Sequence, residues 1–419
     1  MRNRSVRCIG VIIATLSVGC EKSPATDFPD STRAASALAT LDEVLAGAVR
    51  RQDVLGVVAM AVDRNGVFYR GARGTADDVH DMPVRTDAVF RIASMTKPVT
   101  SVAVMQLVER GVVGLDDPAA DYLPELERTQ VVDIIDAESG AYKLRSPATT
   151  MTVRHLLTHT AGFGYAFTSE TIRDYEPIGD DSDVVGPLLF DPGTSWWYGT
   201  NTDWLGRLVE AVSGQGLEEY FREHIFEPLR MPDTSFNVPE ASWSRTMPVA
   251  HRQIGGVLFQ EVRRDPSPVT TYSGGGGLWS TADDYSRFMR MWLNEGVLDG
   301  AHVLSSNTVA TMGDNHVGAL HAGALVSALP ERSNDFRPTA DGRGRWGLGF
   351  LINLDKHPGG RAEGSLAWAG LYNTYFWIDP ASDVAGVLLT QVLPFADPQV
   401  LSVFADFERA VYALAAESS

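Results

Sequence analysis

The chain has almost no cysteine and little lysine. Of its 419 residues only Cys8 and Cys20 are cysteines, so the chain beyond residue 20 can form no internal disulfide and offers no cysteine nucleophile. Of its 35 basic residues only four are lysines, and the others are arginines. An arginine keeps its proton at any usable pH, whereas a desolvated lysine can release one. Each lysine is therefore a candidate for proton transfer.

The sequence also lacks the signatures of several classes of binding site and partner. The formal net charge of −18 argues against a nucleic-acid partner. No zinc, flavin or nucleotide signature appears, so we expect neither a metal nor a cofactor. His155 and His159 are four residues apart but lack a following glutamate and a third ligand, and we interpret them as structural. Gly274–Gly277 lacks the lysine of a phosphate-binding loop and predicts a tight turn.

The first 20 residues resemble an export signal. A basic stretch, residues 1–7, precedes a short apolar stretch, residues 8–19, which is too short to span a bilayer as a stable helix. Residues 16–20 resemble a bacterial lipoprotein processing box that would place a lipid on Cys20, although Ser17 stands where that pattern prefers leucine. We expect an exported protein, either periplasmic or anchored to a membrane as a lipoprotein. Ordinary secretion with cleavage nearby is the second interpretation.

Hydrophobic periodicity predicts helices and strands in separate parts of the chain. Residues 37–50 have helical spacing, and Val57–Val62 is a buried-strand run followed by an Asn65-Gly66 hairpin turn. Helical patterns dominate from about 116 to 270. Strands are expected again at Trp346–Ile352, Thr374–Ile378 and Val384–Thr390, before a closing helix that begins at Pro398. The short connection between the last two strands predicts antiparallel pairing with the early hairpin.

These elements predict an α/β (α+β) fold, in which helices flank an antiparallel sheet and a mostly helical domain is inserted. The predicted boundaries are a signal peptide at 1–20, a tether at 21–36, a sheet domain at 37–115 and 271–419, and a helical domain at 116–270. A hydrophobic content of 44% over this length suffices for one large domain or two interleaved ones.

One lysine follows a serine at a spacing that suits catalysis. Ser94 and Lys97 lie at the start of a predicted helix over residues 94–110, because Pro98 is tolerated only in a first turn. Residues three apart on a helix share a face, so a hydroxyl nucleophile would lie beside a tunable base. A Ser-x-x-Lys spacing with a solvated lysine also arises by chance, and the other motifs decide between these interpretations.

Four motifs occur in the order found in class C β-lactamase-like serine hydrolases, which this chain resembles from about residue 40 to its end. They are Ser94-x-x-Lys97, Leu156–Phe163, Gly274–Thr281 and Gly370 with its flanks. The family includes penicillin-recognising enzymes, D-amino-acid peptidases and family VIII carboxylesterases. The resemblance implies a penicillin-recognising fold and an acyl-enzyme formed on the serine.

The Tyr-x-Asn motif of that family is matched in part. Tyr198 aligns with its tyrosine, but Thr200 holds the third position and the asparagine is displaced to 201. The Tyr…Asp-x-Leu-Gly spacing looks more like the family VIII esterases. Nearby positive charge favours the phenolate form of a tyrosine, so Tyr198 would accept the Ser94 proton and later activate water. A buried aromatic residue without a catalytic role is the alternative.

The third family motif also departs from the β-lactamase pattern. Trp368-Ala369-Gly370 stands where β-lactamases have Lys-Thr-Gly, whose lysine holds the substrate carboxylate. A tryptophan offers apolar area instead, and this variant is similar to that of the esterase branch. By the same analogy Gly370 lets the strand edge pass close to the substrate, and the backbone N–H groups of Ser94 and Leu371 form the oxyanion hole. An ordinary core role for Trp368 is the alternative.

The sequence therefore predicts an exported serine hydrolase that cleaves small carboxylic esters. Ser94 would form the acyl-enzyme, with Lys97 and Tyr198 as the proton-transfer pair. The residues expected to border the substrate are Phe163, Tyr165, Trp197, Trp368, Gly370 and Tyr372. A β-lactamase or D-amino-acid peptidase on the same fold, and a binding lipoprotein without catalysis, stay open as alternatives. No Gly-x-Ser-x-Gly motif occurs, which disfavours the α/β-hydrolase route to an esterase.

Overall fold

The structure is a computed structural model that describes residues 31–77, 82–135, 142–175, 185–339, 341–356 and 359–418. The predicted signal peptide and Cys20 lie outside these residues, so export and lipidation stay predictions. Within the described part of the chain, no helix combines the length and the apolar character that crossing a bilayer requires.

Helices occur along the whole described chain, and the longest are the first and the last. Their bounds are α1 (Ser31–Arg50), α2 (Thr96–Glu109), α3 (Val153–Leu157), α4 (Glu170–Asp174), α5 (Asn201–Ser213), α6 (Leu217–Phe221), α7 (Glu227–Leu229), α8 (Ala282–Leu293), α9 (Ser306–Gly313) and α10 (Pro398–Ser418). The predicted closing helix is confirmed. It begins at Pro398, and the Asp397 carboxylate caps it by accepting hydrogen bonds from the backbone N–H groups of Gln399 and Val400.

A large sheet forms the centre of the molecule. Its strands, in spatial order, are β13 (Arg345–Trp346), β14 (Leu351–Ile352), β15 (Leu366–Gly370), β16 (Thr374–Asp379), β17 (Val384–Leu389), β1 (Gly56–Val62), β2 (Val67–Asp77) and β3 (Met82–Pro83). All of its pairings are antiparallel. Strand β1 lies against β17 with Val58 opposite Leu389, which confirms the predicted pairing of the early hairpin with the late strands.

Smaller sheets surround this one. They are β4 (Phe90–Arg91) with β10 (Trp279–Ser280), β11 (Val297–Leu298) with β12 (Ala301–His302), β18 (Val392–Leu393) with β8 (Ala250–Arg252) and β9 (Leu258–Gln260), and β6 (Tyr142–Arg145) with β5 (Thr129–Ile135) and β7 (Val185–Leu188). The β5–β6–β7 sheet lies in the segment predicted to be mostly helical. The assignment of that segment to a separate domain stays a prediction.

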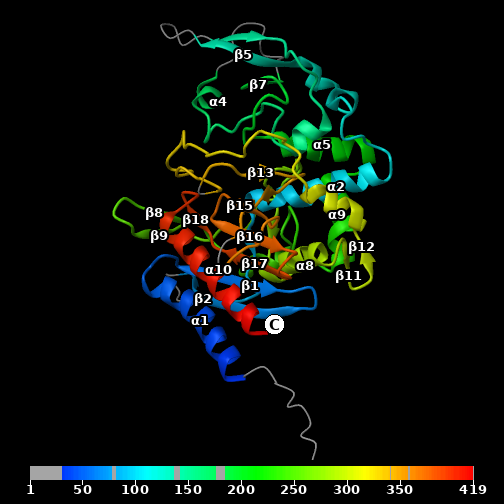
Figure 1. Ribbon diagram of the computed structural model, residues 1–419. Coiled ribbons are helices and arrows are strands. Elements are labelled where there is room, and N and C mark those ends of the chain that lie inside the picture. Colours follow the sequence, from blue (N-terminus) through cyan, green and yellow to red (C-terminus); the bar gives the residue numbers. More distant parts are fainter. Residues whose placement is uncertain are drawn as a thin grey trace, which may run out of the picture.

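Helices cover both faces of the central sheet, as predicted. Figure 1 shows α1 and α10 side by side on one face, with α8 and α2 on the other side of the sheet. Strand β1 is buried throughout because its side chains alternate between two apolar cores. Val57 and Ala59 pack in the core under α1 and α10, whereas Val58 and Met60 pack in the core that contains α2 and α8.

The prediction of one continuous strand over Trp346–Ile352 is wrong. The structure has a tight hairpin there, in which Trp346 of β13 lies opposite Leu351 of β14. Gly349 has a φ of 102°, a conformation that favours glycine and turns the chain back. Strand β15 was not predicted, and it is the strand that carries the Trp-x-Gly motif.

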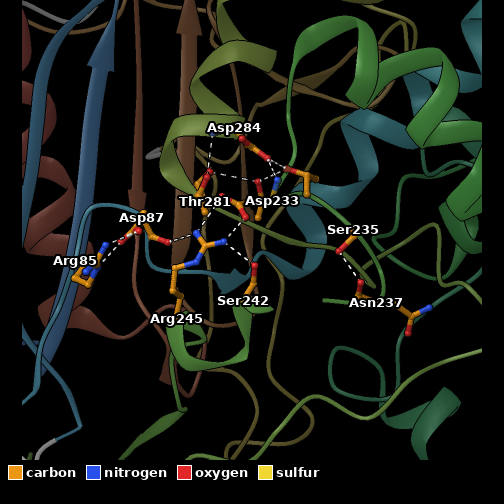
Figure 2. A network of polar contacts seen from close by, with 11 residues as sticks. Arg85, Asp87, Asp233, Ser235, Asn237, Ser242, Arg245, Thr281 and Asp284 are labelled. Atoms are coloured by element: carbon orange, nitrogen blue, oxygen red, sulfur yellow. Dashed lines mark hydrogen bonds and ion pairs between the residues drawn. The ribbon is translucent and has the colours of Figure 1, made fainter. Parts of the chain in front are cut away.

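A buried polar network connects α8 to the short strand β10 (Figure 2). The Asp284 carboxylate accepts hydrogen bonds from the backbone N–H of Asp233 and from the hydroxyl of Thr234, at 2.7 and 2.8 Å. Thr234 also contacts the hydroxyl of Ser280 in β10 at 2.7 Å. Arg245 forms an ion pair with Asp233 and donates to the backbone carbonyl of Asp87. The network thereby fixes β10, and β10 pairs with the strand that precedes Ser94.

Replacing Asp284 by asparagine is expected to flatten the pH dependence of stability. Burial raises the pKa of Asp284 to about 7, so the folded chain holds a proton that the unfolded chain releases. The stability that this proton contributes is fully present below the unfolded pKa, about 4, and is lost as the pH rises through about 7. One pKa unit corresponds to about 1.4 kcal/mol, so the loss is roughly 4 kcal/mol at most.

The measurement is the free energy of unfolding by urea between pH 4 and pH 8. Asp284→Asn should remove most of the decline, because an amide oxygen can accept the same two hydrogen bonds. The control is Asp314→Asn at an exposed carboxylate, which should leave the decline as in the unmodified protein. An Asp284→Asn curve parallel to the unmodified one would contradict the prediction.

Candidate active site

Ser94 lies in a short turn that leads directly into α2. The residues Ala93–Met95 form a single 3-10 turn, and α2 begins at Thr96 rather than at the serine itself. Ala93 has a φ of 45°, a left-handed conformation that costs an alanine about 1 kcal/mol or more. The flanking structure holds this strained turn, because β4 pairs with β10 and the backbone N–H of Ile92 donates to Leu278.

Lys97 is fully buried, and its amine contacts the serine. Lys97 Nζ lies 3.1 Å from Ser94 Oγ, 3.1 Å from the Tyr165 hydroxyl and 2.6 Å from the carbonyl oxygen of Gly275. An ammonium has three N–H donors, and these three oxygens satisfy all of them. A neutral amine at the same place accepts the hydroxyl proton of Ser94 and still donates to Gly275. The contact therefore allows direct proton exchange between the serine and the lysine.

The Tyr198 ring lies beside the Lys97 amine, although the Tyr198 hydroxyl is hydrogen-bonded to Trp368. Lys97 Nζ is 4.7 Å from the centroid of the Tyr198 ring, and Ser94 and Tyr198 line one pocket. The indole N–H of Trp368 donates to the Tyr198 hydroxyl oxygen at 3.0 Å. The predicted hydroxyl, amine and phenol thus converge in one cleft, and Trp368 fixes the phenol oxygen instead of lying in the core without a polar contact.

Tyr165 and Asp203 extend this arrangement beyond the predicted residues. The Tyr165 hydroxyl accepts from Lys97 Nζ, and burial, followed by the nearby Asp203 carboxylate to which it is hydrogen-bonded, raises the pKa of Tyr165 well above its usual range. Tyr165 is therefore a neutral phenol. Asp203 also accepts from the Ser273 hydroxyl at 2.5 Å and from the backbone N–H of Gly275 at 3.1 Å. A hydrogen-bonded chain consequently runs from Ser94 through Lys97 and Tyr165 to Asp203.

The sequence contained a signal for part of this chain. Tyr165 was predicted to border the substrate, not to contact the lysine. Asp203 appeared only as the acidic residue of the Asp-x-Leu-Gly spacing, in the first turn of α5. That spacing is the feature from which the role of Asp203 could have been inferred.

His159 and Asn201 form a buried pair behind the Tyr198 ring. The His159 ring lies 4.9 Å from the Tyr198 ring, and Asn201 Nδ2 lies 2.9 Å from His159 Nδ1. Burial, and then the positive charge of Lys97, hold the pKa of His159 well below its usual range, so the imidazole is neutral. The displaced asparagine thus contacts this histidine, and its amide nitrogen is not directed at Lys97.

The other histidine of the predicted structural pair caps a helix. His155 Nδ1 accepts from the backbone N–H of Thr152, whose hydroxyl in turn accepts from the backbone N–H of His155. Within the described residues, no group of three or more histidine, cysteine, aspartate or glutamate side chains is arranged to hold a metal ion.

The pocket at Ser94 is small and mostly apolar. Its volume is about 20 Å³, room for about one water molecule. Besides Ser94 and Tyr198, its walls are Phe167, Leu325, Trp368, Ala369, Gly370, Leu371 and Phe395. Trp368 and Gly370 were predicted to border the substrate, and Leu371 was predicted as an oxyanion-hole residue. Tyr372 lines the neighbouring cavity, whereas the structure does not place Phe163 or Trp197 among the lining residues of either one.

Gly370 brings β15 against the serine turn. A Cβ at this position would lie 2.2 Å from the hydroxyl oxygen of Thr374 and 2.3 Å from the carbonyl oxygen of Ile92. Only a glycine permits this approach. As a result, Leu371 and Ser94 both line the same pocket. The two backbone N–H groups proposed for an oxyanion hole therefore belong to adjacent walls of one site.

Comparison with known proteins identifies similar sequences and structures. The profile of the family described as Beta-lactamase matches residues 41–406. Monacolin J acid methylbutanoyltransferase of Aspergillus terreus is 30% identical over 416 residues, covering 92% of this chain and 98% of that protein. Esterase EstB of Burkholderia gladioli is 31% identical over 398 residues, covering 86% and 92%.

Solved structures support the same fold. Unliganded simvastatin synthase (LovD) from Aspergillus terreus has a TM-score of 0.76 and 27% identity, covering 90% of this chain and 98% of that one. EstCE1, described as a hydrolase with promiscuous acyltransferase activity, has a TM-score of 0.71 and 22% identity, covering 91% and 100%.

Replacing Gly370 by alanine is expected to damage both stability and activity. The added Cβ must displace β15 from the serine turn, which should lower the free energy of unfolding by about 2 kcal/mol. Because a shift of about 1 Å in a catalytic group can cost about 100-fold, kcat for an ester should fall at least about tenfold. The control is Gly323→Ala, where a Cβ would meet no atom within 4 Å. Equal behaviour of the two variants would contradict the close approach.

Proposed function

The chain belongs to the Beta-lactamase family, and on this premise we propose that it is a carboxylesterase that cleaves small esters through an acyl-enzyme on Ser94. Its esterase and acyltransferase relatives support an activity of the serine hydrolase or acyltransferase kind. The observation that carries the finer proposal is the contact of 3.1 Å between Lys97 Nζ and Ser94 Oγ inside a buried site.

The proposed reaction uses the side chains that meet at the pocket. Ser94 Oγ attacks the ester carbonyl carbon while its proton moves to Lys97 or to Tyr198. The tetrahedral oxyanion is held by the backbone N–H groups of Ser94 and Leu371. Collapse expels the alcohol, which takes up the proton, and leaves the acyl group on Ser94. A water molecule then gives a proton to the same base and attacks the acyl carbonyl. Collapse breaks the bond to Ser94 Oγ, returns the proton from the base to this oxygen and releases the carboxylic acid.

The walls of the pocket favour a small, uncharged acyl group. None of the residues that line it carries a charge, and its volume is about 20 Å³. Trp368, which stands where β-lactamases have a lysine, is occupied with the Tyr198 hydroxyl and cannot pair with a carboxylate. These features support ester hydrolysis over β-lactam hydrolysis at this site.

Acyl transfer to an alcohol is the second candidate, because several relatives bear acyltransferase names. The two activities share the acyl-enzyme and differ only in the molecule that accepts the acyl group. Adding butanol to an ester assay separates them. Production of butyl ester at the expense of free acid identifies a transferase, and unchanged acid production identifies a hydrolase.

Replacing Ser94 by alanine is expected to abolish turnover. Hydrolysis of p-nitrophenyl acetate should fall at least about 1,000-fold, because the acyl-enzyme can no longer form. A fluorophosphonate probe should add one adduct to the unmodified protein, seen by intact-mass spectrometry, and none to Ser94→Ala. The control is Ser382→Ala, at an exposed serine in the turn between β16 and β17.

Other outcomes of this experiment select the alternatives. Failure of the unmodified protein to label would favour a binding protein without catalysis. Rapid turnover of a chromogenic cephalosporin with negligible turnover of esters would favour a β-lactamase.

The two phenols at Lys97 are expected to have unequal effects. Tyr198→Phe should lower kcat for p-nitrophenyl acetate by about 100-fold or more, the usual effect of losing a proton-transfer group. Tyr165→Phe removes one of the three acceptors of Lys97 and should lower kcat by about tenfold. Thermal melting checks that both variants fold. A larger loss in Tyr165→Phe than in Tyr198→Phe would assign the proton transfer to Tyr165 instead.

A further inference from the structure

A second, larger cavity adjoins the pocket at Ser94. Its volume is about 460 Å³, within the range of small-molecule sites, against about 20 Å³ for the pocket itself. The two meet at consecutive residues, because Leu371 lines the pocket and Tyr372 lines the cavity. Gly276 lines the cavity as well, and its Cα–H points toward Ala93, since a Cβ built there would lie 3.8 Å from the carbonyl carbon of Ala93.

Arg91 is held in this cavity by aromatic side chains. The pairing of β4 with β10 sets Arg91 opposite Trp279, and the guanidinium carbon lies 4.8 Å from the Trp279 ring centroid. The same carbon is 5.9 Å from the Tyr372 ring, and Nη1 donates to the Tyr372 hydroxyl at 3.4 Å. A guanidinium between two rings keeps a restricted orientation, and most of its five N–H donors are left for a ligand.

The charge of Arg91 is not neutralised by the protein around it. Among the described residues, no aspartate or glutamate forms an ion pair with Arg91 or with Arg264, the other cation of the cavity. Asp265 lies beside Arg264 in the wall and offsets one of the two positive charges. One positive charge is therefore in excess here, on a chain whose formal net charge is −18.

We propose that Arg91 binds a carboxylate carried by the alcohol portion of the ester substrate. This inference rests on the proposed esterase function and defines the class of its substrates. The acyl portion occupies the small uncharged pocket, and the larger alcohol portion extends into the cavity, where the guanidinium pairs with its carboxylate.

Distance and charge both suit such a ligand. Arg91 precedes Ser94 by three residues, so their Cα atoms are at most about 10 Å apart. An ester held at Ser94 is therefore expected to place an alcohol portion about the size of one aromatic ring in the cavity that Arg91 lines. A single excess positive charge matches a carboxylate, which carries one negative charge, better than it matches a phosphate monoester, which carries nearly two. Trp368 stands where β-lactamases have the lysine that holds a carboxylate, and it lines the pocket at Ser94. The proposed carboxylate contact is made instead by Arg91, which lines the neighbouring cavity.

The test compares two esters that differ in one charge. 4-Acetoxybenzoate carries a carboxylate, and 4-acetoxybenzamide is its neutral counterpart with the same acyl group. For the full chain, the ratio of kcat/KM for the acid to kcat/KM for the amide should exceed one and should decrease with added salt. In Arg91→Gln this ratio should fall by about tenfold or more, through KM for the acid. Arg91→Lys keeps the charge without the planar donors and should give an intermediate ratio.

A matched control and a binding measurement separate the two proposals. Arg128→Gln removes the same charge from an exposed site in another part of the molecule and should keep the unmodified ratio. Calorimetric titration of Ser94→Ala with 4-acetoxybenzoate should detect binding that is lost in Ser94→Ala/Arg91→Gln. Equal ratios for the unmodified protein and Arg91→Gln would overturn the carboxylate site while leaving the esterase function intact. Arg91-dependent binding without turnover of either ester would support the site and contradict the esterase function.

Discussion

The buried amine of Lys97 is the constraint on which the rest of the site depends. Placing an ammonium where no solvent reaches it costs several kcal/mol unless hydrogen bonds replace its hydration. Here three oxygens from separate segments supply them: Ser94 in the turn before α2, Tyr165 in the loop before α4, and the carbonyl of Gly275. The glycine-rich turn interpreted from the sequence as a tight turn thus also provides the closest partner of the lysine. The same positive charge helps to keep His159 neutral behind the Tyr198 ring.

The frame around that amine is rigid for reasons that can be traced to particular contacts. Ala93 holds an unfavourable backbone conformation, and the pairing of β4 with β10 keeps it there. Strand β10 is fixed in turn by Ser280, whose hydroxyl contacts Thr234 in the network around Asp284. The buried carboxyl group of Asp284 in α8 therefore supports the position of the nucleophile. The pairing of β4 with β10 also orients Arg91. One short pair of strands therefore positions residues of both the pocket at Ser94 and the proposed carboxylate site.

The parts of this molecule that sequence could predict are those that local spacing determines. Ser94 and Lys97 meet because the 3-10 turn at Ala93–Met95 leads directly into α2, so that residues three apart still share a face. The early and late strands pair because their apolar runs and short turns favour it. The hairpin at Trp346–Leu351 was missed because glycine turns interrupt a run that otherwise resembles a strand. The contacts of Tyr165 with Lys97 and of Asp203 with Tyr165 could not be predicted, since they depend on how distant segments pack. The pocket walls Leu325 and Phe395 come from loops without any periodic pattern.

The central sheet is closed by strands from both halves of the chain, with β1 next to β17 and the Gly370 end of β15 against the turn at Ser94. During synthesis the serine and its lysine leave the ribosome early, whereas Trp368, Gly370 and Leu371 follow only near the end of translation. A nascent chain that has not yet reached them lacks one wall of the pocket at Ser94 and one of the two proposed oxyanion donors. The proposed acyl transfer therefore requires the finished polypeptide, because a partly made chain contains Ser94 and Lys97 without the residues that complete the site.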